Sequence, residues 1–128
     1  MTQQKTLDDL LVSEDDLNEE LLTEVLAPYV CIGDDSGAFI PTDEFESLQS
    51  TEKVAVFLLY RKAAYELDLD DDEGATPLEV TEASGINHNT VKGAVRELDD
   101  KNLVQNEDGE YSVPAYSYDS VRELIRGD

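Results

Sequence analysis

Apolar side chains recur every three or four residues in several stretches of the chain, which is the spacing of helices that bury one face. These patterns predict a short helix over 42–48 and longer helices over 14–27, 50–67, 77–84, 87–102 and 117–126. Two pairs of β-rich runs surround the turn sequences Asp-Ser-Gly and Glu-Asp-Gly, so hairpins are predicted over 29–41 and 103–113. We therefore expect an α+β fold that is mostly α.

The helix predicted over 50–67 differs from the others because it is apolar nearly all round. A helix without a polar face is usually central to a core or lies in a subunit interface. The chain has 128 residues, which is the size of one domain. We expect a flexible N-terminus over 1–12, a helix and hairpin extension over 13–49, and one domain with a C-terminal helix over 50–128.

The segment between the long helix and the second hairpin carries several helix-boundary signals. Thr76 is placed to cap a helix, Pro77 to occupy its first position and Glu79 to complete a capping box. Gly85 suits the residue that follows the last turn, and Asn87 suits the cap of the next helix. The short connection predicts the tight turn of a helix-turn-helix, and the second hairpin follows directly.

The same segment reads TPLEVTEASGINHNTVKGAVRELDDKNLV, followed by QNEDGEYSV. It resembles the winged helix-turn-helix domains of archaeal and bacterial transcription regulators, and the matching positions are Gly85, Ile86, Thr90, Val91, Leu98, Leu103 and Val104. The resemblance covers about residues 50–114 and implies a winged helix fold, with 87–102 as the recognition helix and 103–113 as the wing. It departs from the family where acids replace the usual bases, at Glu97, Asp99, Asp100, Glu107, Asp108 and Glu110.

Helix geometry assigns the faces of the helix predicted over 87–102. With Val91, Val95 and Leu98 toward the core, the exposed side holds the candidate DNA-binding residues Asn87, His88, Asn89, Thr90, Lys92, Gly93 and Arg96. Asn89 suits bidentate pairing with adenine, and Lys92 and Arg96 suit guanine or phosphate. Asn87 and Thr90 can cap the helix and bind phosphate. Gly93 costs about 1 kcal/mol inside a helix, so we expect DNA or another helix to approach closely there.

The chain carries 31 acidic and nine basic residues, a formal net charge of −22. Residues 1–49 hold 13 acids and one base, and residues 50–128 hold 18 acids and eight bases, so the charge is spread throughout. This distribution is similar to that of proteins from halophilic archaea, and it informs solubility rather than fold. Residues 83–96 hold no acid, as a surface facing phosphates requires. Burial alone can also exclude acids, as the acid-free run 53–65 indicates.

Other candidate sites have simpler interpretations. Asp68, Asp70, Asp72 and Glu79 imitate the spacing of a calcium loop, but the glycine is displaced to position 74, so a solvated acidic loop is favoured. The single histidine, His88, and the single cysteine, Cys31, do not suggest a zinc site. We expect Cys31 to be a small buried side chain.

Three tyrosines follow the second predicted hairpin or lie within it: Tyr111, Tyr116 and Tyr118. We expect them to pack the hairpin and the final helix against the core rather than to form a stacking platform for single-stranded nucleic acid. No arrangement of nucleophile and base, phosphate loop or dinucleotide fingerprint is present in the sequence. We therefore predict neither an enzyme nor a cofactor.

The N-terminus lacks a signal pattern and no apolar run reaches the length of a membrane span, so a cytoplasmic protein without a membrane partner is predicted. The resemblance implies a sequence-specific regulator that binds double-stranded DNA as a homodimer, joined through the apolar face of 14–27 or of 117–126. The alternative is a winged-helix interaction module that docks the transcription or replication machinery and does not itself read DNA. A neutral to basic face over 87–97 favours DNA, whereas acids crossing it favour a protein.

Overall fold

The computed structural model describes residues 6–11 and 13–126. Its elements in chain order are η1 (Leu7–Leu10), α1 (Glu14–Leu26), β1 (Val30–Ile32), β2 (Phe39–Pro41), α2 (Asp43–Glu46), α3 (Ser50–Glu66), α4 (Pro77–Ser84), α5 (His88–Asp100), β3 (Gln105–Glu107), β4 (Glu110–Ser112), η2 (Ala115–Ser117) and α6 (Tyr118–Arg126). The fold is α+β and mostly helical, which confirms the predicted class. Each predicted helix and hairpin is present, with its ends displaced by at most two residues.

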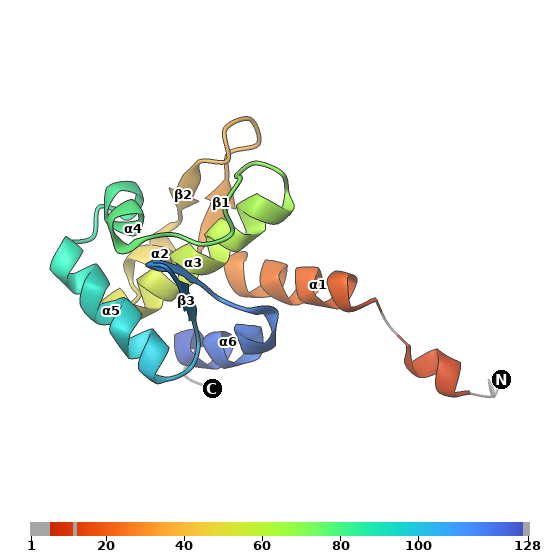
Figure 1. Cartoon of the computed structure of the whole chain (residues 1–128). Coiled ribbons are helices and arrows are strands. Elements are labelled where there is room, and N and C mark those ends of the chain that lie inside the picture. Colours follow the sequence, from red (N-terminus) through yellow and green to blue (C-terminus); the bar gives the residue numbers. More distant parts are fainter. Residues whose placement is uncertain (1–5, 12, 127–128) are drawn as a thin grey trace.

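The predicted flexible segment 1–12 is only partly covered, because residues 1–5 and 12 lie outside the described residues. Within it, residues 7–10 form the short helix η1, which buries none of its side chains. Figure 1 shows η1 and the beginning of α1 projecting away from the other helices. Among the described helices, none combines the length and the apolar character that crossing a bilayer requires.

Helix α3 lies at the centre of the fold, as its uniformly apolar sequence predicts (Figure 1). All seven side chains from 54 to 60 are buried, so this stretch of the helix has no side that faces solvent. Four other helices, α1, α4, α5 and α6, pack against it. Burial on all sides explains the missing polar face, because each side of α3 contributes to the same core.

Helices α1 and α6 pack against each other as well as against α3. The apolar side chains Val121 and Ile125 of α6 are buried, and Glu24 of α1 forms ion pairs with Arg122 and Arg126 at 3.4 and 3.6 Å. The apolar faces expected to join two copies are thus occupied within one chain. Leu17 of α1 stays exposed, and the homodimer itself remains a prediction.

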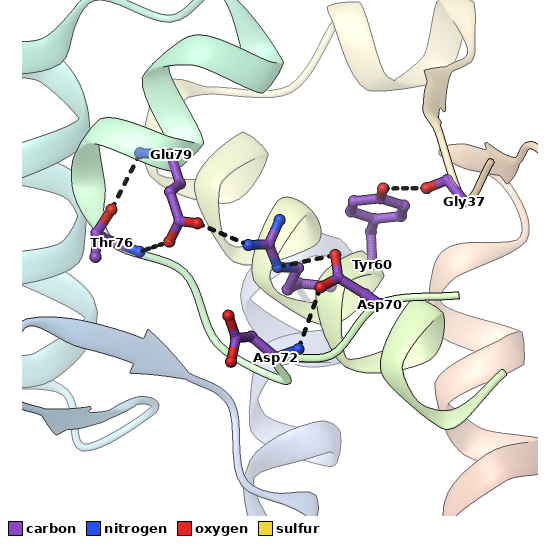
Figure 2. Close-up of polar contacts among 7 residues, drawn as sticks. Gly37, Tyr60, Asp70, Asp72, Thr76 and Glu79 are labelled. Atoms are coloured by element: carbon purple, nitrogen blue, oxygen red, sulfur yellow. Dashed lines mark hydrogen bonds and ion pairs between the residues drawn. The ribbon is translucent and has the colours of Figure 1, made fainter. Parts of the chain in front are cut away.

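The first hairpin, β1–β2, is antiparallel and lies over one end of α3. The ring of Phe39 meets those of Phe45, Phe57 and Tyr60, with centroids 5.0–5.3 Å apart. The Tyr60 hydroxyl donates a hydrogen bond to the carbonyl of Gly37 in the hairpin turn (Figure 2). Burial raises the pKa of this hydroxyl above its ordinary value, so it stays protonated and keeps donating.

The prediction that Cys31 is buried is wrong, because its side chain is exposed. Cys31 is the middle residue of β1 and pairs with Ile40 of β2. Neighbouring side chains of a strand point to opposite faces, and the preceding Val30 is the one that enters the core. The alternation of side chains along β1 therefore places Cys31 on the exposed face, despite the general tendency of cysteine to be buried.

The second hairpin, β3–β4, is antiparallel and gains a third neighbour from Ala75, two residues before α4. Ala75 and Tyr111 exchange two backbone hydrogen bonds of 2.8 and 2.9 Å. A Cβ atom added at Gly74 would lie 2.9 Å from the Tyr111 carbonyl oxygen, so a side chain there would disturb this pairing. The bridge anchors the hairpin to the segment that leads into α4.

The three tyrosines of this region differ in burial. Tyr118 is buried and Tyr111 is partly buried against the core, as predicted. Burial raises the pKa of the Tyr118 hydroxyl. The prediction is wrong for Tyr116, whose side chain is 77% exposed and whose hydroxyl accepts a hydrogen bond from the Gln105 amide at 3.2 Å. Tyr116 lies in η2, on the side of that turn that faces solvent.

Candidate nucleic-acid interface

The start of α4 is fixed by a capping box, as predicted. The Thr76 hydroxyl accepts a hydrogen bond from the Glu79 backbone at 3.2 Å, and the Glu79 carboxylate accepts one from the Thr76 backbone at 2.9 Å (Figure 2). The second carboxylate oxygen of Glu79 accepts from the Arg61 guanidinium of α3 at 3.0 Å. The same guanidinium lies 3.4 Å from Asp70. One arginine thus ties α4 and the preceding acidic loop to the central helix.

The turn between α4 and α5 follows the sequence prediction closely. Gly85 has a φ of 77°, a left-handed conformation that favours glycine, and its backbone donates to the Thr81 carbonyl at 2.9 Å. The Asn87 side-chain oxygen accepts from the Asn89 backbone at 2.9 Å and caps α5. Because that oxygen is engaged, Asn87 offers a partner its amide donors only, which suits phosphate rather than a base.

Helix α5 turns one face to the core and the other to solvent. Its buried side chains are Val91, Ala94, Val95 and Leu98, and it packs chiefly against α3. All the candidate residues are exposed: Asn87, His88, Asn89, Thr90, Lys92, Gly93 and Arg96. The predicted assignment of faces is therefore confirmed. His88 also meets the Thr81 hydroxyl of α4 through its Nδ1 atom at 3.3 Å.

The two cations on this face differ from the other cations of the molecule. The structure describes eight basic residues, and six of them lie within 4.0 Å of a carboxylate: Lys53, Arg61, Lys62, Lys101, Arg122 and Arg126. Within the described residues, Lys92 and Arg96 have no such partner. Lys92 and Arg96, the two described cations without an acidic partner, both project from the exposed face of α5.

Gly93 lies between these two cations on the same exposed face. A Cβ atom added to it would meet nothing within 4 Å among the described residues. The expectation that another helix approaches Gly93 therefore does not hold inside this chain. No contact among the described residues requires a glycine at this position.

The C-terminal end of α5 is acidic on its exposed face, because Asp99 and Asp100 are exposed one turn beyond Arg96. Glu97 accepts a hydrogen bond from the Thr51 hydroxyl of α3 at 2.6 Å and pairs with Lys101 at 3.7 Å. Its carboxylate is thus held toward α3 and the C-terminal end of the helix. The part of the face over 87–96 is neutral to basic, and Glu97 stays half exposed at its edge, so the face over 87–97 is not free of acid. Sequence reasoning could not find the contact with Thr51, because Thr51 is 46 residues away.

The β3–β4 hairpin, predicted as the wing, carries the opposite charge. Its acids Glu107, Asp108 and Glu110 line one hollow together with Asp71, Asp72 and Glu73 of the loop after α3. No residue of α5 is among those that line this hollow in the described part of the chain. The hairpin and the loop therefore form one anionic surface that is separate from the face bearing Lys92 and Arg96.

The acidic loop does not assemble the calcium site that its spacing imitates. Asp70 faces Arg61, and it also accepts a hydrogen bond from the backbone of Asp72 at 3.1 Å (Figure 2). Glu79 belongs to the capping box of α4. Over residues 6–11 and 13–126, no three histidine, cysteine or acidic side chains come together in a way that could hold a metal ion.

Comparison with known proteins adds nothing to this geometry. No family model, no curated protein and no solved structure matches the chain. The function of the α5 face therefore rests on the placement and charge of its own residues.

Proposed function

We propose that the chain is a sequence-specific DNA-binding regulator of transcription with a winged helix-turn-helix fold. The order of elements supports this fold: α3, the Ala75 bridge, α4, α5 and the β3–β4 hairpin follow one another as the helices and strands of such domains do. The observation that carries the function is the pair Lys92 and Arg96, two cations without a carboxylate partner among the described residues, on the exposed surface over 87–96, which holds no acid.

In this proposal α5 lies in the major groove and reads bases from its N-terminal half. Arg96 would contact guanine with its two-pronged guanidinium, Asn89 would pair with adenine, and Lys92 would contact guanine or phosphate. Gly93 lets the helix backbone approach the DNA closely. The anionic β3–β4 hairpin stays off the phosphates, so affinity depends on base contacts more than on phosphate neutralisation.

The anionic hairpin also supports a second candidate, an interaction module that docks a basic protein of the transcription or replication machinery. Six acidic side chains from the hairpin and the neighbouring loop line one hollow: Asp71, Asp72, Glu73, Glu107, Asp108 and Glu110. A positively charged partner would complement that surface. This candidate does not account for the bare cations on α5, so we place it second.

The test is selection of binding sites from random double-stranded DNA by the full-length chain in molar potassium chloride. We expect one enriched motif that contains guanine, and we expect the double variant Lys92→Gln/Arg96→Gln to bind it at least about 100-fold more weakly, since a good base contact contributes about 1–3 kcal/mol. Arg96→Lys keeps the charge but loses the paired donors, so it should relax the preference for guanine.

The matched control is Lys101→Gln/Arg126→Gln, which removes two positive charges that already have acidic partners. Its affinity should stay within about threefold of the wild type, because both changes lie outside the exposed face of 87–96. Enrichment of a palindrome would support binding as two copies, and a single half-site would support a monomer. If no motif is enriched, or if both double variants bind equally, reading of DNA by α5 is refuted.

A further inference from the structure

The N-terminal segment exposes leucine side chains that the fold does not use. Leu7, Leu10 and Leu11 are 82%, 72% and 76% exposed, and Leu17 near the start of α1 is 54% exposed. These four are nearly half of the nine large apolar side chains that are exposed in the described part of the chain. Exposed apolar groups concentrated in one projecting segment mark a surface that binds another molecule.

These leucines have the spacing of a helix that binds in a groove. Leu7, Leu10 and Leu11 stand at positions i, i+3 and i+4, which are the anchor positions of such helices. Leu7 and Leu10 lie in the 3-10 helix η1, and Leu11 follows it in extended backbone, so binding in a groove would extend the helical turn to Leu11. The turn is already formed, because the Asp9 carboxylate accepts a hydrogen bond from the Thr6 backbone at 2.9 Å. A partner would therefore meet a segment that is partly ordered before binding.

The charge around the leucines decides which kind of partner fits. Residues 7–20 carry seven acidic side chains and no basic one. None of the seven pairs with a cation among the described residues. A second copy would bring like charges together along this segment, and an anionic lipid surface would repel it. A groove bordered by lysine and arginine would instead complement both the leucines and the acids.

We propose that residues 7–11 form a docking segment that inserts Leu7, Leu10 and Leu11 into an apolar groove bordered by basic side chains on another protein. The segment lies at the opposite end of the molecule from α5 (Figure 1). A partner bound there leaves the α5 face free. This inference stands on the exposed leucines and their acidic surroundings, so it holds or fails independently of DNA binding.

The experiment places a photo-crosslinking amino acid at position 10 of the full-length chain, in cells of the source organism. The control places it at position 16, an exposed acidic residue in the first turn of α1. We expect position 10 to capture one protein and position 16 not to capture it. The captured protein is then purified, its surface is checked for a basic-rimmed apolar groove, and its affinity for the whole chain is measured.

Three variants identify what that protein recognises. Leu10→Ser/Leu11→Ser should weaken binding at least tenfold, and Asp8→Asn/Asp15→Asn should weaken it and reduce its dependence on salt. Leu67→Ser removes a leucine that is 56% exposed at the end of α3, and it should change the affinity less than twofold. All three changes are at exposed side chains, so the urea midpoint should stay at the wild-type value. The leucine variant should bind the selected DNA as the wild type does.

Several results would overturn the proposal. Crosslinks that join two copies of this chain would assign the leucines to self-association, and crosslinks to lipid would assign them to a membrane surface. Failure to capture any protein at position 10, or capture of one that binds the leucine variant as tightly as the wild type, would leave the segment without a docking role.

Discussion

At the scale of single residues, two glycines of the α4–α5 region are required for different physical reasons. Gly93 is inside a helix with open space around it, so Gly93→Ala should raise the free energy of unfolding by about 1 kcal/mol. The added methyl group would stand where we propose that DNA approaches the backbone, so affinity for the selected DNA should fall at least tenfold. Urea unfolding and a DNA titration of the same preparation measure both effects.

Gly85→Ala is the matched change at the turn, and its effect on stability should have the opposite sign. Gly85 has a φ of 77°, and forcing a side chain into that conformation costs about 1–2 kcal/mol. If Gly93→Ala is more stable and also binds DNA as tightly as the wild type, then no close contact is made at position 93. The two alanines thus separate the folding role of a glycine from its role in binding.

Single-residue burial was the least predictable property of this sequence. Thr76, Gly85 and Asn87 behave as predicted because a cap depends on residues at most four positions away. Cys31 and Tyr116 do not, since their exposure depends on which face of a strand or turn the rest of the chain covers. Leu17 continues the apolar stripe of α1 beyond the point where the fold offers a surface to cover it.

At the scale of elements, α4 depends on its cap. An eight-residue helix is too short to be stable alone, and the capping box satisfies two of its terminal backbone groups. Thr76→Ala should lower the free energy of unfolding by about 1 kcal/mol. It should also speed amide exchange in α4 and weaken DNA binding, because α4 sets the position of the turn into α5. Thr76→Ser should retain the wild-type behaviour.

The control for this change is the equivalent cap of another helix. The Thr42 hydroxyl accepts a hydrogen bond from the Phe45 backbone at the start of α2, which lies outside the α4–α5 region. The Thr42 hydroxyl also donates a hydrogen bond to the Pro28 carbonyl at 2.7 Å, so Thr42→Ala should cost at least as much free energy as Thr76→Ala while leaving DNA affinity unchanged. Equal losses of affinity in both variants would mean that general stability, and not the placement of α4, controls binding.

The helices and strands themselves were predictable because their boundaries carry local signals. Which elements pack against one another was not predictable. The Ala75–Tyr111 bridge joins residues 36 positions apart through backbone atoms, so no side-chain pattern in the sequence indicates it. The apolar stripes of α1 and α6 predicted correctly that each helix buries a face. Whether that face meets a second copy or the same chain depends on three-dimensional packing, and here the two helices meet each other.

At the scale of the whole molecule, positive and negative charge are separated. The acids of the β3–β4 hairpin and the loop after α3 gather around one hollow, while the described cations without acidic partners are on α5. Such separation would orient the molecule on approach to DNA, with the anionic side away from the phosphates. The proposed docking segment adds a third surface, acidic and apolar, at the far end from α5 (Figure 1).

The net charge of −22 should make the stability of the fold depend on salt. Excess charge of one sign destabilises a compact state through self-repulsion, and potassium chloride screens that repulsion. We expect the urea midpoint to rise steeply between 0.1 and 1 M potassium chloride and then to level off, because the screening length is already about 3 Å at 1 M.

The triple variant Asp71→Asn/Asp72→Asn/Asp108→Asn tests whether carboxylate repulsion causes this salt dependence. It removes three charges from the hollow beside the β3–β4 hairpin. If repulsion is responsible, the variant should be more stable than the wild type at 0.1 M salt and equally stable at 2 M. A parallel displacement of the two curves would instead mean that salt acts on burial of apolar surface, since that effect does not depend on these carboxylates. A wild-type midpoint that does not change with salt would show that carboxylate repulsion contributes little to folding.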